Sequence, residues 1–172
     1  TFLINNLQQS TLAAAKGNML YEAQQSLDLA ANDIRLSSNA DTNNRWPDSN
    51  SPGGAGSPLS WQSNSSTLVL ATAAENSSGT IIFADSKNYI TEKNNIVYFV
   101  KDKTLYKHTI ASTVSNNAAK TSCPKASSNS SCPADKELLH NVTAFTVTYK
   151  DGEDNSVVPA NARSVELAVT VS

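Results

Sequence analysis

Residues 1–38 read TFLINNLQQSTLAAAKGNMLYEAQQSLDLAANDIRLSS, with no proline and a single glycine, Gly17. Leucine, alanine and glutamine recur throughout this stretch, and all three favour a helical backbone. We expect one helix of about ten turns, about 55 Å long at about 1.5 Å per residue. The mean globular helix has only about 11 residues. A helix of this length has more surface than residues 39–172 can cover, so its uncovered part needs another partner.

The apolar residues of this expected helix fall on two faces. One stripe at helical spacing is expected to lie on a sheet, and it consists of Leu12, Ala15, Met19, Ala23, Leu27, Ala30 and Ile34. Before Leu12 the same face carries Asn5 and Gln9, which do not suit a core. A second, narrower strip is expected to stay exposed and to contact a partner, and it consists of Leu3, Leu7, Ala14 and Tyr21. The alternative is a frayed amphipathic start without a partner.

Residues 39–66 are predicted to form a variable loop. Asn39–Asn44 is rich in turn-forming residues, and Arg45–Ser66 is rich in proline, glycine and serine. Trp46 and Trp61 lie in this loop. Two interpretations stay open for them: they bury their rings and anchor the loop on the core, which is the commoner case, or they contact a glycan or protein ligand.

Residues 67–172 are predicted to form an antiparallel sheet domain. Alternating apolar residues and turn signals favour strands in seven ranges: 67–72, 79–84, 89–91, 95–101, 104–110, 142–149 and 163–172. Asp102 and Lys103 connect the best hairpin, and His108 alternates outward on its second strand. The expected fold class is α+β, with the long N-terminal helix packed on one face of the antiparallel sheet and with long irregular loops.

Cys123 and Cys132 lie nine positions apart in the polar loop 111–137. A zinc site would need four ligands, and His108 and His140 are the only histidines. We therefore expect a disulfide, which closes an exposed loop and stabilises by about 2–3 kcal/mol on the chain-entropy model. Such a bridge predicts an extracytoplasmic chain.

Composition and motifs argue against several function classes. The net charge is −2 and the pI about 5.6, without the basic patch typical of a nucleic-acid groove. No nucleophile, base or metal set can be assembled from the motifs, so we expect no enzyme and no cofactor. Asp151, Glu153 and Asp154 are a weak calcium candidate, because their spacing lacks the EF-hand pattern and an acidic solvated turn is the favoured interpretation.

Three segments together resemble the type IV pilin and pseudopilin family, and most closely its J-type minor pseudopilins and W-type minor pilins. Residues 27–38, LDLAANDIRLSS, are similar to the end of the family's helix. Residues 95–109, NIVYFVKDKTLYKHT, resemble the family's hairpin, with Lys107 where arginine is common. Residues 138–172 are similar to its closing unit: a leucine pair, a strand, an Asp-Gly turn and a final strand that begins A-R-S-V-E-L.

This resemblance implies a pilin-like roll and the role of a filament subunit, which helps to prime assembly at the filament tip. Its partners would be other pilin or pseudopilin subunits, in a cell-surface filament or a cell-envelope pseudopilus. Family members carry an N-terminal hydrophobic segment that anchors them in the membrane. The sequence starts inside a helical pattern, so we expect that segment to be absent here. The alternative function is a secreted binding module or adhesin that contacts a glycan or protein through the Trp46 and Trp61 loop.

Overall fold

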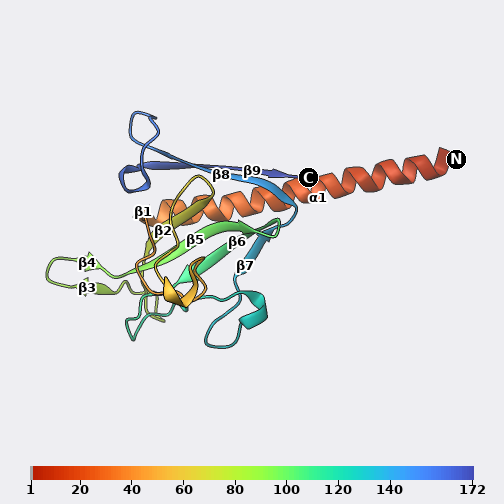
Figure 1. The fold of residues 1–172 in the computed structure, drawn as a ribbon. Coiled ribbons are helices and arrows are strands. Elements are labelled where there is room, and N and C mark those ends of the chain that lie inside the picture. The colour runs from red at the N-terminus through yellow and green to blue at the C-terminus, as the bar shows by residue number, and fades with distance from the viewer. Residues whose placement is uncertain (1) are drawn as a thin grey trace.

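The computed structural model describes the backbone of residues 2–172 and the side chains from residue 16 onward. Helix α1 (Phe2–Leu36) is 35 residues long and is the α-helix of this part of the chain. Figure 1 shows α1 running along the strands, with its N-terminal end lying beyond them. The chain passes directly from α1 into strand β1 (Ser37–Ala40), where the Ser37 hydroxyl donates a hydrogen bond to the Ile34 carbonyl over 2.6 Å.

The strands form three separate antiparallel sheets. The largest has the order β1-β2-β5-β6-β7. Its other members are β2 (Thr67–Ala73), β5 (Lys93–Lys101), β6 (Thr104–Ile110) and β7 (Lys136–Leu139). The second sheet is the short hairpin of β3 (Phe83–Asp85) and β4 (Ile90–Thr91), and the third pairs β8 (Val142–Lys150) with β9 (Ser164–Val171). Three single turns of 3₁₀ helix lie in the loops, at Gly54–Gly56, Lys125–Ser127 and Pro159–Asn161.

The predicted hairpin at residues 95–110 is confirmed. Strands β5 and β6 pair from Asn95 opposite Ile110 to Lys101 opposite Thr104. Asp102 and Lys103 form the two-residue turn, and both have positive φ, 48° and 59°. Two consecutive left-handed residues are the mark of a type I′ turn, which matches the twist of the flanking strands. The hairpin therefore forms although its turn lacks the preferred Asn-Gly pair.

The expected packing of a long helix over one antiparallel sheet, as a pilin-like roll, is wrong. The main core lies between the five-stranded sheet and the β8–β9 hairpin, and β8 and β9 supply most of the apolar side chains that cover the sheet. In the part of α1 whose side chains are described, only Ala30 is a fully buried apolar residue. The physical reason is the apolar area that each element buries. In the described part of the stripe, Ala23 and Ala30 are small, and the larger Met19, Leu27 and Ile34 are only half-buried. Strand β8 alone buries Phe145, Val147 and Tyr149 in the core.

The other face of the five-stranded sheet is also covered, and loops cover it. A second cluster there consists of Trp61, Val69, Val97 and Ile110, with Trp46 and Phe99 packed against it. The expectation that His108 faces outward is wrong, because this side chain lies on the loop-covered face and is 0% exposed. Loops 41–62 and 122–135 thus act as a second layer over the sheet.

The C-terminal part of α1 is fixed to the sheet by a polar contact. The Tyr98 hydroxyl donates to the Asp33 carboxylate over 2.5 Å, and the Lys107 ammonium lies 2.5 Å from the same oxygen. Burial and the neighbouring Asp33 carboxylate raise the pKa of Tyr98 well above its ordinary value, so the phenol stays protonated as a donor. The Ser26 hydroxyl donates to the Leu138 carbonyl of β7 over 2.7 Å, so α1 is held against the sheet at two points.

Candidate functional site

Helix α1 presents exposed apolar side chains on its outer surface. Leu20 is 68% exposed, Tyr21 64% and Leu36 68%. The Tyr21 hydroxyl accepts a hydrogen bond from the Gln25 amide one turn later, which holds the ring along the helix surface. Leu3, Leu7, Leu12 and Ala14 lie outside the residues whose side chains are described. Among the expected core-facing residues, Met19, Ala23, Leu27 and Ile34 are half-buried. Leu20 and Tyr21 are thus both left uncovered by the rest of the chain.

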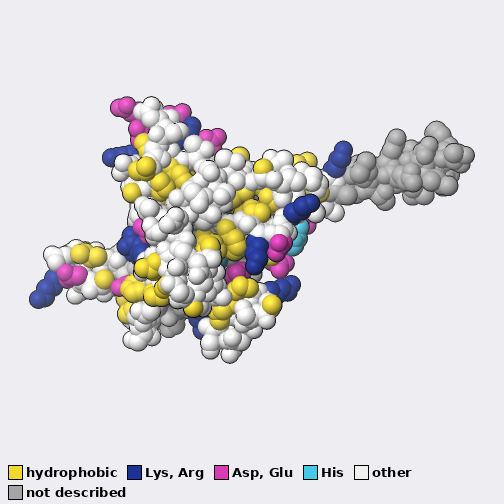
Figure 2. Space-filling model, viewed as in Figure 1, with side chains coloured by type: hydrophobic (Ala, Val, Ile, Leu, Met, Phe, Trp, Pro, Cys, Tyr) yellow, Lys and Arg dark blue, Asp and Glu magenta, His cyan; other side chains and the backbone are white. Residues whose placement is uncertain are grey.

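The β3–β4 hairpin is a second exposed apolar surface. Ile81, Phe83, Tyr89 and Ile90 are all large, apolar and exposed. The Phe83 and Tyr89 rings meet edge to face, with centroids 6.2 Å apart. Figure 1 shows this hairpin projecting from the opposite end of the molecule to the N-terminus of α1, and Figure 2 shows hydrophobic side chains at its surface. Exposed apolar side chains grouped in this way mark contact surfaces in many proteins.

The two tryptophans hold the 39–66 loop on the sheet. The Trp61 ring is buried, and its indole N–H donates to Asp48 over 2.6 Å. The Trp46 ring is half-buried, and its N–H donates to the Lys93 carbonyl over 2.7 Å. Both polar edges are therefore occupied by protein groups. The structure places these side chains as loop anchors, and it leaves neither indole N–H free for a ligand.

His108 is the centre of a buried polar cluster that the sequence did not reveal. Its Nε2 lies 3.0 Å from the Asp48 carboxylate, and its Nδ1 lies 2.7 Å from the Asp135 carboxylate. The Ser122 hydroxyl lies 3.0 Å from the same Nδ1. Strand β6 supplies the histidine, the 39–66 loop supplies Asp48, and the disulfide loop supplies Ser122 and Asp135. We call these four residues the His108 cluster.

The electrostatics of the His108 cluster favour a protonated imidazole. Burial alone would lower the pKa of His108, but the hydrogen bonds and charges of Asp135 and Asp48 outweigh it and raise that pKa to about 9. For Asp48, burial would raise the pKa, but His108, Trp61 and the Asn50 backbone N–H hold it below its ordinary value. An imidazolium between two carboxylates is therefore the resting state at neutral pH.

This geometry differs from that of a hydrolytic triad. In a triad the nucleophile and the orienting carboxylate use opposite ring nitrogens, so the imidazole can accept a proton. Here Ser122 and Asp135 share Nδ1, Asp48 occupies Nε2, and a charged imidazole has no basic nitrogen left. The cluster ties one strand and two loops together. No local sequence signal marks it, because its residues come from one strand and two loops that lie far apart in the sequence.

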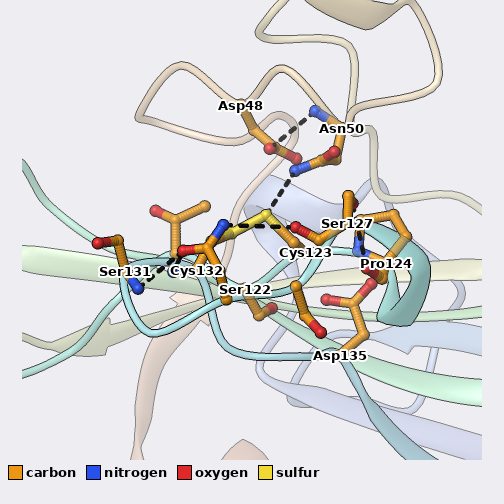
Figure 3. The surroundings of a disulfide bond; sticks show 12 residues. Asp48, Asn50, Ser122, Cys123, Pro124, Ser127, Ser131, Cys132 and Asp135 are labelled. Carbon is orange, nitrogen blue, oxygen red and sulfur yellow. Dashed lines mark hydrogen bonds between the residues drawn. A yellow bond between two sulfur atoms is a disulfide. The ribbon is translucent and has the colours of Figure 1, made fainter.

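The disulfide between Cys123 and Cys132 is confirmed, with Cα atoms 5.6 Å apart. Figure 3 shows it between the Asp48–Asn50 segment and the residues Ser122 and Asp135. The Asn50 amide contacts the Cys123 sulfur over 3.5 Å, and the Asp135 N–H donates to the Cys123 carbonyl over 2.8 Å. The bridge therefore fixes the loop that carries half of the His108 cluster. A structural disulfide is consistent with an oxidising, extracytoplasmic location.

The acidic turn at residues 151–155 is organised by its own backbone. The Asp151 carboxylate accepts hydrogen bonds from the Glu153 and Asn155 N–H groups over 2.8 and 3.0 Å, which lowers the pKa of Asp151. Asp154 pairs with Lys150 over 2.8 Å, and Glu153 is exposed. The described residues hold no group of three or more histidine, cysteine, aspartate or glutamate side chains arranged for a metal ion.

Comparison with protein-family models, curated proteins and solved structures gives no match for this chain. Within the described residues, no helix combines the length and the apolar character needed to cross a membrane.

Proposed function

We propose that this chain is a structural subunit of an extracytoplasmic filament, in the minor pilin or pseudopilin role that the three sequence segments imply, and that α1 is its assembly element. The observation that carries the proposal is the exposure of Leu20 and Tyr21 on α1. The chain's own strands contact α1 from β2, β7 and β9, and they leave these two side chains uncovered.

The occupant that fits this surface is a helix of a neighbouring subunit. Leu20 and Tyr21 are consecutive residues, so their side chains leave α1 about 100° apart and form a short apolar strip across the helix, with polar residues such as Gln24, Gln25 and Asp28 beyond it. A second helix that packs against α1 can bury a strip this short, whereas a flat surface would also bury the surrounding polar groups. Burying a leucine side chain contributes about 1.5–3 kcal/mol, and a chain of such contacts along α1 would hold a subunit in place.

The role also fits the rest of the molecule. The contacts of Asp33 and Ser26 hold α1 against the sheet at two points, so the strip is presented in a defined orientation. The disulfide and the His108 cluster hold together a globular part that can persist outside the cytoplasm.

The test changes the strip without changing the fold. Leu20→Asp combined with Tyr21→Asp replaces two exposed side chains, and Leu59→Asp is the matched control on an exposed leucine of the 39–66 loop. Each variant replaces the native chain in the cells that make it, and surface filaments are sheared off and assayed for the chain by immunoblot. We expect at least a tenfold loss from the filament fraction for the helix variant and none for the control.

Thermal unfolding of the purified chains accompanies this assay. Exposed positions away from the core change stability by less than about 0.5 kcal/mol, so both variants should unfold as the wild type does. A helix variant that is folded, expressed and incorporated at the wild-type level would refute the assembly role of α1.

A further inference from the structure

A pocket of about 450 Å³ opens on the loop-covered face of the sheet, next to the β5–β6 turn. The Trp61, Phe99 and Tyr106 rings form a row along it. The Trp61 and Phe99 centroids are 4.7 Å apart, and the Phe99 and Tyr106 centroids are 5.5 Å apart with nearly parallel planes. Trp61 is buried at the inner end of the row, while Phe99 and Tyr106 are half-buried and line the opening. We call this the aromatic pocket.

The walls of the aromatic pocket are held in place before any ligand arrives. His108 and Asp135 line its floor, and they belong to the buried His108 cluster. Asn50 lines another wall, and it is fixed by its backbone N–H donating to Asp48 and by its amide contact with Cys123. Preformed walls reduce the ordering cost of binding.

The rim of the pocket carries charges of both signs. Lys101 and Lys125 are cationic and Asp102 is anionic, while Asn50 offers a neutral amide. Asp135 already accepts from His108, and Lys125 lies 3.7 Å from Glu137 outside the pocket. An anionic or cationic ligand would therefore meet a group of its own sign at the opening. A neutral ligand with many hydroxyl groups meets donors and acceptors without such a conflict.

We propose that the aromatic pocket is a binding site for a neutral saccharide. A pyranose ring has one face of C–H groups and an edge of hydroxyls, and these match the Phe99 and Tyr106 rings and the polar rim respectively. The volume is within the range of about 300–1,000 Å³ that ligand sites occupy. Its described lining residues come from β2, β5, β6 and the loops, with none from α1, so this site is separate from the assembly strip.

The test is saturation-transfer difference NMR on the purified, disulfide-bonded chain with maltotriose, N,N′-diacetylchitobiose and lactose as neutral probes. Glucuronic acid and a Gly-Phe-Gly peptide serve as the charged and the aromatic-peptide probes. We expect transfer to the ring C–H protons of at least one neutral saccharide, and at least fivefold less to glucuronic acid and to the peptide.

Variants then locate the site. Tyr106→Ala removes the outer ring, and Tyr89→Ala is the matched control, since Tyr89 is exposed on the distant β3–β4 hairpin. Asn50→Ala is the second pocket variant, which keeps the test valid if Tyr106→Ala does not fold. We expect transfer to fall at least fivefold in each folded pocket variant and to persist in the control. The proposal is overturned by no transfer to any neutral saccharide, by transfer that pocket variants leave unchanged, or by preferred binding of glucuronic acid or the peptide.

Discussion

Replacing His108 by glutamine removes the one positive charge between Asp48 and Asp135 and leaves both carboxylates buried. The resulting loss of folding stability can be worked out from the pKa of His108. The pKa of His108 rises from 6.5 to about 9 on folding. At about 1.4 kcal/mol per pKa unit, the imidazolium stabilises the fold by about 3 kcal/mol. This figure agrees with the about 3–5 kcal/mol of stability that is lost when one member of a buried ion pair is removed. For a chain of this size we expect Tm to fall by about 10 °C.

The pH dependence has a definite sign. Because the pKa of His108 is raised in the folded state, its contribution is complete below about pH 6.5 and is lost as the pH rises toward 9. Because the pKa of Asp48 is lowered, its contribution is present above its ordinary value of 3.8 and is lost at lower pH. The wild-type chain should therefore be most stable between about pH 4 and 6.5.

Urea unfolding at pH 6 and pH 9.5, followed by tryptophan fluorescence, measures both effects. From pH 6 to pH 9.5 the free energy of unfolding of the wild type should fall by about 3 kcal/mol, and that of His108→Gln should stay almost constant. His140→Gln is the matched control, because His140 is exposed. If the wild-type free energy of unfolding falls by less than about 1 kcal/mol, or by the same amount as in His108→Gln, His108 does not act as a charged group between Asp48 and Asp135. Changing Asp48 and Asp135 to asparagine in the His108→Gln background should restore part of the stability, since no charge then stays buried.

Three further predictions concern the loops and the helix contact. Replacing Cys123 and Cys132 by serine should lower the free energy of unfolding by about 2–3 kcal/mol in urea titrations, and a loss under 0.5 kcal/mol would contradict the structural role of the bridge. Lys103→Gly should raise stability by about 0.5–1 kcal/mol, because glycine adopts the positive φ at that position without strain, whereas Lys101→Gly in β5 should lower it. Asp33→Asn should lower the free energy of unfolding by about 2–3 kcal/mol, since Tyr98 and Lys107 both lose a charged partner. Asp28→Asn is the control, because Asp28 is exposed on α1, and it should leave the free energy of unfolding nearly unchanged.

The regular strands were predictable from the sequence because alternation is a local signal. In β9, Val165, Leu167, Val169 and Val171 face the core and the residues between them are exposed, as expected. The β5–β6 hairpin was predictable for the same reason. Strand β1 was missed, because Ser37–Ala40 has no β-branched residue and is held by backbone pairing with β2. Short strands of this kind carry almost no signal of their own.

The covering of the sheet could not be read from alternation. A period of two tells which residues share a face, but it does not tell what covers that face. The apolar stripe of α1 was expected to cover one face, yet β8 and β9 cover most of it. The loops that cover the other face are rich in serine, asparagine and glycine, which have no periodic pattern.

The His108 cluster was missed for a related reason. Asp48 lies 60 residues before His108 in the sequence, and Asp135 lies 27 residues after it. Only the folded loops bring the three together. The disulfide was predictable because both cysteines lie in one short loop, and the same loop carries Ser122 and Asp135 next to them.

The assembly role of α1 is tested most directly by site-specific photo-crosslinking inside intact filaments. A photoreactive phenylalanine analogue replaces Tyr21, and the same analogue at the exposed Val158 serves as the control. Cross-linked peptides are then identified by mass spectrometry. We predict that position 21 cross-links to a helical segment of a second subunit, while position 158 gives no such product. Cross-links from position 21 that stay within the same chain, or an absence of the chain from the filament, would contradict the account.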